Sequence, residues 1–162
     1  MSAAPAPAWR IDYLARHPRL VPTLARWHHA EWSALLPRWS LATATAELAG
    51  HVRTRALPTT LVALDGDGAP LGSVSLLDDD HDELTRWSPW LASLYVVPGA
   101  RGAGLGRALV TALRDEARAL AVPRLHLYTE DRRAWYASLG WSPLERITLG
   151  SGHTVDVMAI VP

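Results

Sequence analysis

The sequence predicts a mixed α/β fold, of the α+β type, with helices packed on a central mixed β-sheet. Three features indicate it: short apolar runs rich in β-branched residues, amphipathic segments at helical spacing, and an element order that does not alternate regularly. The expected order is a strand, two helices, three strands, a helix, a strand, a helix and two strands. This order fits a mixed sheet better than a regular βαβ repeat.

The first half of the chain carries the patterns of two helices and a hairpin. Residues 1–8, rich in Ala and Pro, are expected to be a flexible leader before a single domain at residues 9–162. The patterns then predict, in order, a strand at residues 9–13, a helix at 18–36, a helix from the N-cap Ser40 to about Arg55, and hairpin strands at 59–64 and 71–77.

The second half begins with an acidic loop at residues 78–86. The patterns after it predict a strand at 90–97 that Pro98 stops, a helix at 105–120, a strand at 123–129, a helix at about 131–139, and two strands divided near residues 150–152. The segment from residue 90 to residue 120 therefore reads as strand, tight turn and helix.

That tight turn is rich in glycine and arginine. The first N–H groups of a helix lack intrahelical partners and the helix dipole favours negative charge there, so a pyrophosphate can bind. Gly102, Gly104 and Gly106 remove side chains that would keep a ligand from these amides, and Arg101 and Arg107 add positive charge. A turn that only lets a strand pack on a helix remains the alternative.

Two other phosphate motifs are excluded or weakened by inspection. A P-loop needs Gly-Lys followed by Ser or Thr, and the sequence contains none. A dinucleotide fingerprint needs a third glycine three residues after a Gly-x-Gly pair, where this sequence has Arg107 or Leu109. Nicotinamide or flavin binding is therefore a weak alternative.

Composition narrows the function classes further. The chain has 16 basic and 16 acidic residues, so no global charge attracts nucleic acid or an anionic membrane. It has no cysteine, which excludes a thiol nucleophile and thiolate metal sites, and no metal site is expected. Neither a signal peptide nor a membrane span is evident, and a cytoplasmic protein is expected.

A second motif lies about thirty residues after the turn, at Trp135-Tyr136-x-x-x-Gly140-Trp141. Together with Arg101-x-x-Gly104-x-Gly106 it resembles the motifs of the GCN5-related N-acetyltransferases (GNAT), and the element order does so along nearly the whole chain. The resemblance implies a sheet of six to seven strands, about four helices, and acetyl-CoA held between two splayed strands.

The resemblance also implies roles for individual residues. The backbone of Val96 and Val97 would meet the pantetheine arm, and Tyr136 would protonate or stabilise the leaving thiolate. Thr129 stands where many relatives carry an Asn that touches the arm. The pyrophosphate would lie against Arg101, Gly102, Ala103, Gly104, Leu105, Gly106 and Arg107.

The general base is not evident from the resemblance. Many relatives place a glutamate six residues ahead of the proline, where this chain has Ala92. His126 is the first replacement to consider, because imidazole titrates near neutral pH. Weaker candidates are Asp80 and His81 in the acidic loop and Glu31, and an amine that arrives neutral needs no strong base.

The acceptor pocket is expected between the first two helices and the acidic loop. Glu31, Trp32, Asp80, His81 and Trp90 are the expected contacts, because aromatic walls with carboxylates suit a cationic amine. The chain is thus expected to move an acetyl group by direct attack in a ternary complex, to a peptide N-terminus or a small amine, as a monomer or homodimer. The alternative is a non-catalytic acyl-CoA sensor or partner-binding module on the same fold.

Overall fold

The helices and strands follow one another in the expected order. The strands are β1 (Arg10–Tyr13), β2 (Thr59–Leu64), β3 (Pro70–Leu77), β4 (Trp90–Val96), β5 (Leu125–Thr129), β6 (Ser142–Thr148) and β7 (Thr154–Ile160). The α-helices are α1 (Val21–Trp32), α2 (Leu41–Gly50), α3 (Leu105–Ala119) and α4 (Arg133–Ser138).

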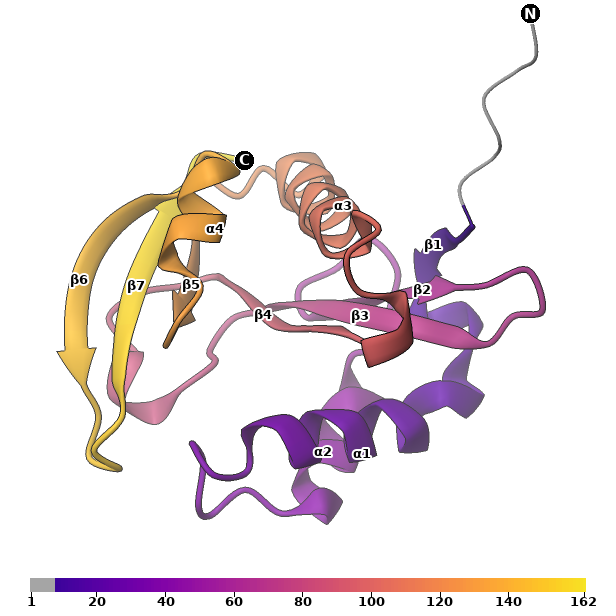
Figure 1. The fold of residues 1–162 in the computed structure, drawn as a ribbon, viewed down its shortest axis with the longest axis horizontal. Coiled ribbons are helices and arrows are strands. Elements are labelled where there is room, and N and C mark those ends of the chain that lie inside the picture. Colours follow the sequence, from indigo (N-terminus) through magenta and orange to yellow (C-terminus); the bar gives the residue numbers. More distant parts are fainter. Residues whose placement is uncertain (1–7) are drawn as a thin grey trace, which may run out of the picture.

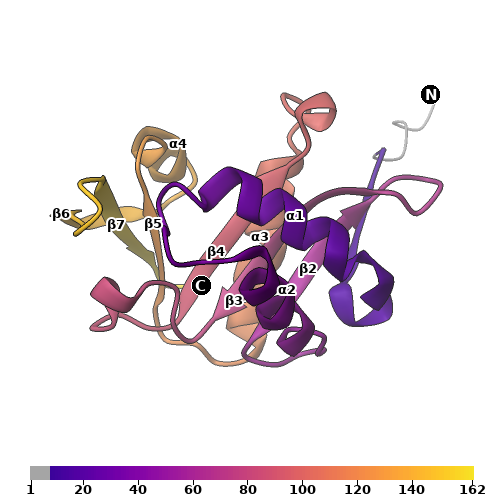
Figure 2. The same ribbon diagram turned by 90° about the horizontal axis from the view of Figure 1, so that it is seen from below.

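The strands form one sheet, with helices on both of its faces. The computed structural model describes residues 8–162, so the expected leader lies, except for Ala8, outside the described residues. The seven strands have the order β1-β2-β3-β4-β5-β7-β6, and only the β4–β5 pair is parallel. Helix α3 covers one face, and α1 and α2 cross β2, β3 and β4 on the other (Figures 1 and 2). The expected mixed sheet is confirmed.

The two N-terminal helices are shorter than their patterns predicted. Residues 18–20 form a 3-10 turn, so α1 begins at Val21, and it ends at Trp32 instead of reaching residue 36. Ser40 caps α2 as expected, since its Oγ accepts a hydrogen bond from the N–H of Thr43 at 3.0 Å. The helix ends at Gly50, well before Arg55, because glycine favours chain reversal over helix continuation.

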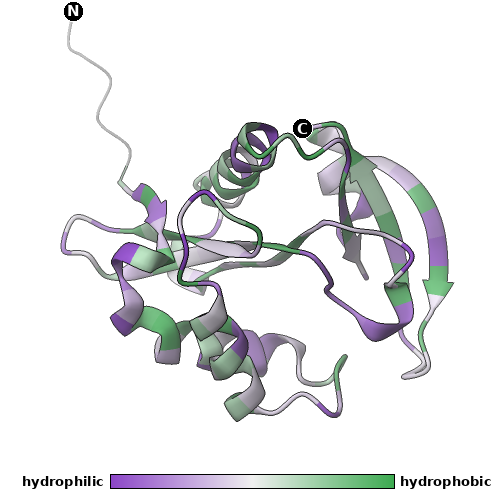
Figure 3. Ribbon diagram, turned by 180° about the vertical axis from the view of Figure 1, so that it is seen from behind, coloured by the Kyte–Doolittle hydropathy of each residue, from purple (hydrophilic) through white to green (hydrophobic). Residues whose placement is uncertain are grey.

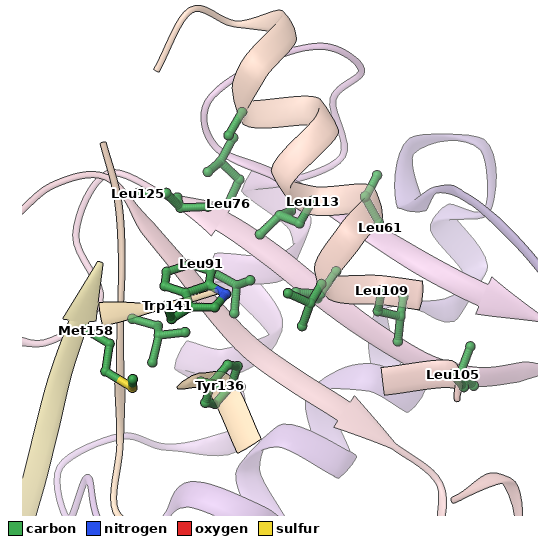
Figure 4. Close-up of a cluster of buried hydrophobic side chains, with 14 of the residues drawn as sticks. Leu61, Leu76, Leu91, Leu105, Leu109, Leu113, Leu125, Tyr136, Trp141 and Met158 are labelled. Atoms are coloured by element: carbon green, nitrogen blue, oxygen red, sulfur yellow. The ribbon is translucent and has the colours of Figure 1, made fainter. Parts of the chain in front are cut away.

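Apolar side chains fill the space between α3 and the sheet. Leu105, Leu109 and Leu113 recur every four residues along one side of α3 and are at most 1% exposed. They pack with Leu76 of β3 and Leu91 of β4 (Figure 4). The period of four residues places these leucines on one helix face, so burying that face anchors α3 and the glycine turn before it.

The opposite face of the sheet is apolar near β1 and polar near β4. Val62 and Leu64 of β2 pack against α1 and α2 in a second apolar cluster. On β3 the side chains that alternate with the buried Val74 are Ser73 and Ser75, both at most 1% exposed. Hydroxyl groups therefore lie beneath α1 and α2, on the side of the sheet that leads toward β4.

Strands β4 and β5 meet at one point and then diverge. Their register contains a single pair, Trp90 with His126, whereas β3 and β4 stay paired from Leu77 and Trp90 to Gly72 and Val96. The two ribbons separate beyond that point (Figure 1). Strand β4 also carries a bulge near Ser93, whose φ of 55° is in the left-handed region. The sheet is thus split along the middle.

Candidate functional site

A cleft of about 1250 Å³ opens where β4 and β5 separate. The glycine turn and α3 lie at one end of it, and α1, α2 and the loop between β3 and β4 lie at the other. That loop is strongly hydrophilic (Figure 3). A recess of about 260 Å³ adjoins the cleft beside α2, and the two cavities share Glu47, His51, Leu77 and Asp80. The cleft thus joins the predicted phosphate turn to the predicted acceptor pocket.

The glycine turn has the geometry of an anion site. Gly104 is the N-cap of α3 with φ of 87°, and Gly102 has φ of 81°. A Cβ built on either glycine would meet nothing within 4 Å, so the backbone there faces open space. The first N–H groups of a helix have no intrahelical acceptors, and those of α3 follow this open turn directly. The turn therefore fits an anion of pyrophosphate size.

Arginine side chains flank this turn. Arg101 donates a hydrogen bond from Nε to the carbonyl of Val96 at 2.9 Å, which fixes its guanidinium beside the end of β4. Arg107 lies on the first turn of α3, and both arginines line the cleft. Gly106 lies against α4, since a Cβ on it would be 3.6 Å from the ring of Trp135.

The structure does not bring every predicted cofactor residue to the cleft. Val96 and Leu105 line it, but Val97 and Ala103 do not. The N–H of Val97 donates to the carbonyl of Leu71 on β3, and its carbonyl accepts from the N–H of Ala100. Both backbone groups of Val97 are thus already hydrogen-bonded within the protein, because the chain turns immediately after this residue.

Tyr136 lies near the middle of the cleft. Its ring packs between Trp135 and Trp141, with centroid distances of 4.9 and 6.1 Å, and Figure 4 shows it beside Trp141 and Met158. The side chain is 7% exposed and its hydroxyl has no hydrogen-bond partner among the described residues. Burial raises the pKa of Tyr136 to about 12, so the hydroxyl stays protonated at physiological pH. An unpaired, protonated phenol can donate a proton or a hydrogen bond.

Thr129 ends β5 and also lines the cleft. Its Oγ1 accepts a hydrogen bond from the N–H of Arg132 at 3.1 Å, just before α4 begins. The hydroxyl therefore helps to hold the start of α4, and its own proton is left for a second partner.

His126 and Trp90 do not line the cleft, although both were predicted site residues. Nδ1 of His126 lies 3.0 Å from the carbonyl of Pro89, and burial lowers the pKa of this imidazole. Trp90 is fully buried, and its Nε1 donates to the carbonyl of Trp87. Both side chains occupy the point where β4 and β5 still pair, so they close the cleft without facing into it.

The other predicted acceptor contacts do reach the cleft. Glu31, Trp32, Asp80 and His81 all line its far end. Carboxylates are numerous in the cleft: Glu31, Glu47, Asp80, Asp82 and Glu83 come from α1, α2 and the β3–β4 loop, and Glu130 and Asp131 follow β5. Among the residues that the structure describes, arginines therefore flank the cleft at the glycine turn, and carboxylates outnumber the single arginine, Arg38, that lines it toward α1, α2 and the β3–β4 loop.

Sequence reasoning missed a chain of polar groups on the cleft wall. Ser75 lies opposite Ala92, and its Oγ is 2.7 Å from Oγ1 of Thr60, which is 3.2 Å from Nδ1 of His51. Burial lowers the pKa of His51 to about 4, so this imidazole is neutral at pH 7. Hydroxyls on otherwise apolar β2 and β3 were the available signal, because buried hydroxyls need partners.

Some features that other kinds of site would require are absent from the part of the chain that the structure describes. Within residues 8–162, no three His, Cys, Asp or Glu side chains gather as a metal site would require. No helix in the same range combines the length and apolar composition needed to cross a bilayer.

Comparison with known proteins finds a matching family model and a relative that aligns with only part of this chain. Residues 21–141 match the family model described as Acetyltransferase (GNAT) family. A mycothiol acetyltransferase from Beutenbergia cavernae is 40% identical over 91 residues, which are 52% of this chain but 28% of that protein. The chain therefore spans well under half the length of this relative.

Solved structures share the fold at low identity. An aminoglycoside 6′-N-acetyltransferase complexed with coenzyme A has a TM-score of 0.74 at 15% identity, over 94% of this chain and 96% of that one. A ribosomal-protein-alanine N-acetyltransferase from Brucella melitensis has a TM-score of 0.71 at 23% identity, over 94% and 99%. A putative acetyltransferase from Salmonella typhimurium, solved with acetyl-CoA, has a TM-score of 0.66 at 21% identity, over 94% and 93%.

The family model covers most of the chain, from α1 through the glycine turn to Trp141. Its span includes both the turn that fits a pyrophosphate and the segment that carries Tyr136. The chain belongs to the GNAT family of acetyltransferases, whose acetyl donor is acetyl-CoA.

Proposed function

We propose that this protein transfers an acetyl group from acetyl-CoA to the primary amine of a cationic acceptor. The observation that carries the proposal is the single cleft between β4 and β5, with an anion-binding turn at one end and carboxylates at the other. Such a cleft suits a negatively charged donor and a positively charged acceptor that meet near Tyr136.

The residues around the turn fit the pyrophosphate of coenzyme A. The open backbone at Gly102 and Gly104 and the guanidinium groups of Arg101 and Arg107 would hold it, as argued for an anion above. When bound, acetyl-CoA supplies an acetyl thioester, whose carbonyl carbon accepts the amine lone pair while the carbon–sulfur bond breaks.

Tyr136 would supply the proton that the departing sulfur needs, and its phenolate would regain a proton from the attacking nitrogen, which must lose one to become a neutral amide. Tyr136 lines the cleft, and its hydroxyl lacks a partner among the described residues and remains protonated because burial raises its pKa to about 12. Direct attack by the amine, without a covalent enzyme intermediate, fits a chain that contains no cysteine.

The acceptor would be a peptide N-terminus or a small amine that carries positive charge. Trp32 and the carboxylates at the far end of the cleft suit an ammonium group through cation–π and charge contacts. The names of an aminoglycoside 6′-N-acetyltransferase and a ribosomal-protein-alanine N-acetyltransferase point to transfer onto nitrogen, and together with the mycothiol acetyltransferase they span different acceptor classes without choosing among them.

The test measures coenzyme A release against a panel of amines. Because the protein has no cysteine, a thiol reagent would report released coenzyme A without background from the enzyme. The panel should contain peptides with free N-termini, polyamines and aminoglycosides, with uncharged amines as controls. Turnover on cationic amines supports the proposal. Coenzyme A binding without turnover on any amine would favour an acyl-CoA sensor, and absence of binding would contradict both functions.

A further inference from the structure

The cleft wall lacks an obvious group to take the proton from an acceptor ammonium. Ala92 presents only a methyl group there, and Ser75 opposite it is already bonded to Thr60. Of the histidines, His126 lies outside the cleft, Nε2 of the buried His28 is hydrogen-bonded to Oγ of Ser73, and Nδ1 of His81 accepts a hydrogen bond from the N–H of Glu83. An ammonium is not a nucleophile until it loses a proton, so the proposed reaction needs an acceptor for that proton.

We infer that Asp80 is the catalytic residue that removes this proton. The inference rests on the proposed function, because it concerns the acceptor amine of that same reaction. In the step, one N–H bond of R–NH3⁺ breaks, its electron pair stays on nitrogen, and the proton joins the Asp80 carboxylate. The products are R–NH2 and the neutral acid of Asp80, which later releases the proton to solvent.

Asp80 differs from the other carboxylates that line the cleft. Glu47 accepts a hydrogen bond from Nε1 of Trp39, Glu83 accepts one from the N–H of Gly150, and Glu130 lies 2.5 Å from Nδ1 of His153. Those that remain beside Asp80 are Glu31, Asp82 and Asp131, and all three are exposed to solvent. Within residues 8–162, Asp80 is the one cleft carboxylate that is both half-buried and without a hydrogen-bond or ion-pair partner.

The position of Asp80 also suits the role. It follows β3 by three residues, near the place where β4 and β5 still pair, and it lines both the cleft and the recess beside α2. Glu47 of α2 is close enough for its charge to raise the pKa of Asp80, and Asp80 is close enough to raise the pKa of Tyr128 on β5. A carboxylate held between two walls of the acceptor pocket can meet an ammonium directly.

The surroundings tune this carboxyl toward proton transfer near neutral pH. Burial raises the pKa of Asp80 to about 7, and the negative charge of Glu47 adds to the rise. The other titratable groups around it are His51 after α2, Asp78, Asp79 and His81 on its own loop, and Tyr128 on β5. His51 is a poorer proton acceptor at pH 7, because burial lowers its pKa to about 4.

The decisive experiment compares Asp80→Asn with Asp67→Asn, which changes an exposed carboxylate in the turn between β2 and β3 that lines neither the cleft nor the recess. Asp80→Asn should lower kcat by about 10²-fold, the usual scale of base catalysis, and abolish the rise of kcat with pH near 7. Coenzyme A affinity should not change, and Asp67→Asn should keep the wild-type rate and pH profile.

Two further measurements keep the inference testable if Asp80→Asn folds poorly. Glu47→Gln removes the neighbouring charge and should move the rise of kcat to lower pH. Carbon-13 NMR of aspartate carboxyls in the free protein should show one group that titrates near pH 7, a signal missing from Asp80→Asn and displaced to lower pH in Glu47→Gln.

The outcomes separate this inference from the proposed function. If the wild type acetylates amines and Asp80→Asn has the same rate and pH profile, Asp80 is not the proton acceptor although the function stands. An equal loss in Asp67→Asn, or a carboxyl that titrates only in the ordinary acidic range, would also overturn the assignment. If the wild type acetylates no amine, the proposed function fails and this role fails with it.

Discussion

Nε of Arg101 donates a hydrogen bond to the carbonyl of Val96 at 2.9 Å, and this contact ties the glycine turn to the last residue of β4. Because Nε is used internally, the two terminal amino groups of the guanidinium remain for an anion. The same residue thus both shapes the turn and supplies positive charge to the cleft.

Replacing Arg101 should weaken the binding of the nucleotide part of coenzyme A. Arg101→Ala removes a charge beside the anion site and the link to Val96, so we expect Kd for coenzyme A to rise by about tenfold or more. Isothermal titration at two salt concentrations measures the effect. Arg118→Ala, which removes an exposed arginine paired with Asp115 near the other end of α3, is the matched control. Equal weakening in both variants would contradict a specific role for Arg101.

Tyr136→Phe should reduce turnover without reducing coenzyme A affinity. The hydroxyl has no partner among the described residues, so its loss leaves no buried group unpaired and the free energy of unfolding should change little. We expect kcat to fall by about 10²-fold, the usual scale for a lost general acid. Thiol release and calorimetry measure the two effects. A variant with the wild-type rate would remove Tyr136 from the chemistry.

Alanine at two glycines of the turn should affect stability in opposite directions. Gly104 has φ of 87°, so Gly104→Ala should lower the free energy of unfolding by about 1–2 kcal/mol. Gly106 lies in the first turn of α3, and a Cβ there makes an ordinary 3.6 Å contact with Trp135. Gly106→Ala should therefore keep or raise stability by up to about 1 kcal/mol. Urea unfolding of both variants checks the contrast, and equal losses would show that strain at Gly104 is not the cause.

His28 should make the folded protein less stable at acidic pH, because its side chain takes up a proton less readily in the folded chain than in the unfolded chain. His28 is 2% exposed, with Nε2 at 2.9 Å from Oγ of Ser73. Burial lowers its pKa from the ordinary 6.5 to about 4, and the nearby His51 contributes to the shift. Between these values the unfolded chain binds the extra proton. Stability is therefore fully present above pH 6.5 and is lost as pH falls toward 4.

The expected loss from His28 is about 2 kcal/mol between pH 7 and pH 5, on the scale of 1.36 kcal/mol per pKa unit. Urea unfolding at both pH values measures it. His28→Gln cannot take up a proton in the unfolded chain, so its stability should depend less on pH by about that amount. An unchanged pH dependence in this variant would assign the acid sensitivity to other groups.

The sequence predicted the element types well because their patterns are local. The leucines of α3 recur every four residues, and the apolar strands are bounded by turn residues, so both were recognisable without tertiary information. The helix ends were less predictable. Residues 18–20 continue the helical pattern but form a 3-10 turn, and Gly50 ends α2 although apolar residues follow it.

The site was predictable only where its residues are close together in the chain. The turn and Tyr136 lie in contiguous motifs and reach the cleft as expected. His126 and Trp90 lie outside the cleft, because their orientation depends on where β4 and β5 pair, which no local pattern reveals. The surroundings of Asp80 also depend on the tertiary fold, because Glu47 and Tyr128 approach it from α2 and β5, which are distant in the sequence.

The single pair between β4 and β5 also divides the molecule into two half-sheets, β1–β4 and β5–β7. Beyond Trp90, the edge of β4 that faces β5 has no strand to pair with, so a molecule seated there would bridge the halves as a missing strand does. Amide protons on that edge should exchange with solvent faster than those bonded to β3, and binding should slow them. Bound acetyl-CoA would then act as a structural part of the sheet, and the protein without it would be the more flexible of the two forms.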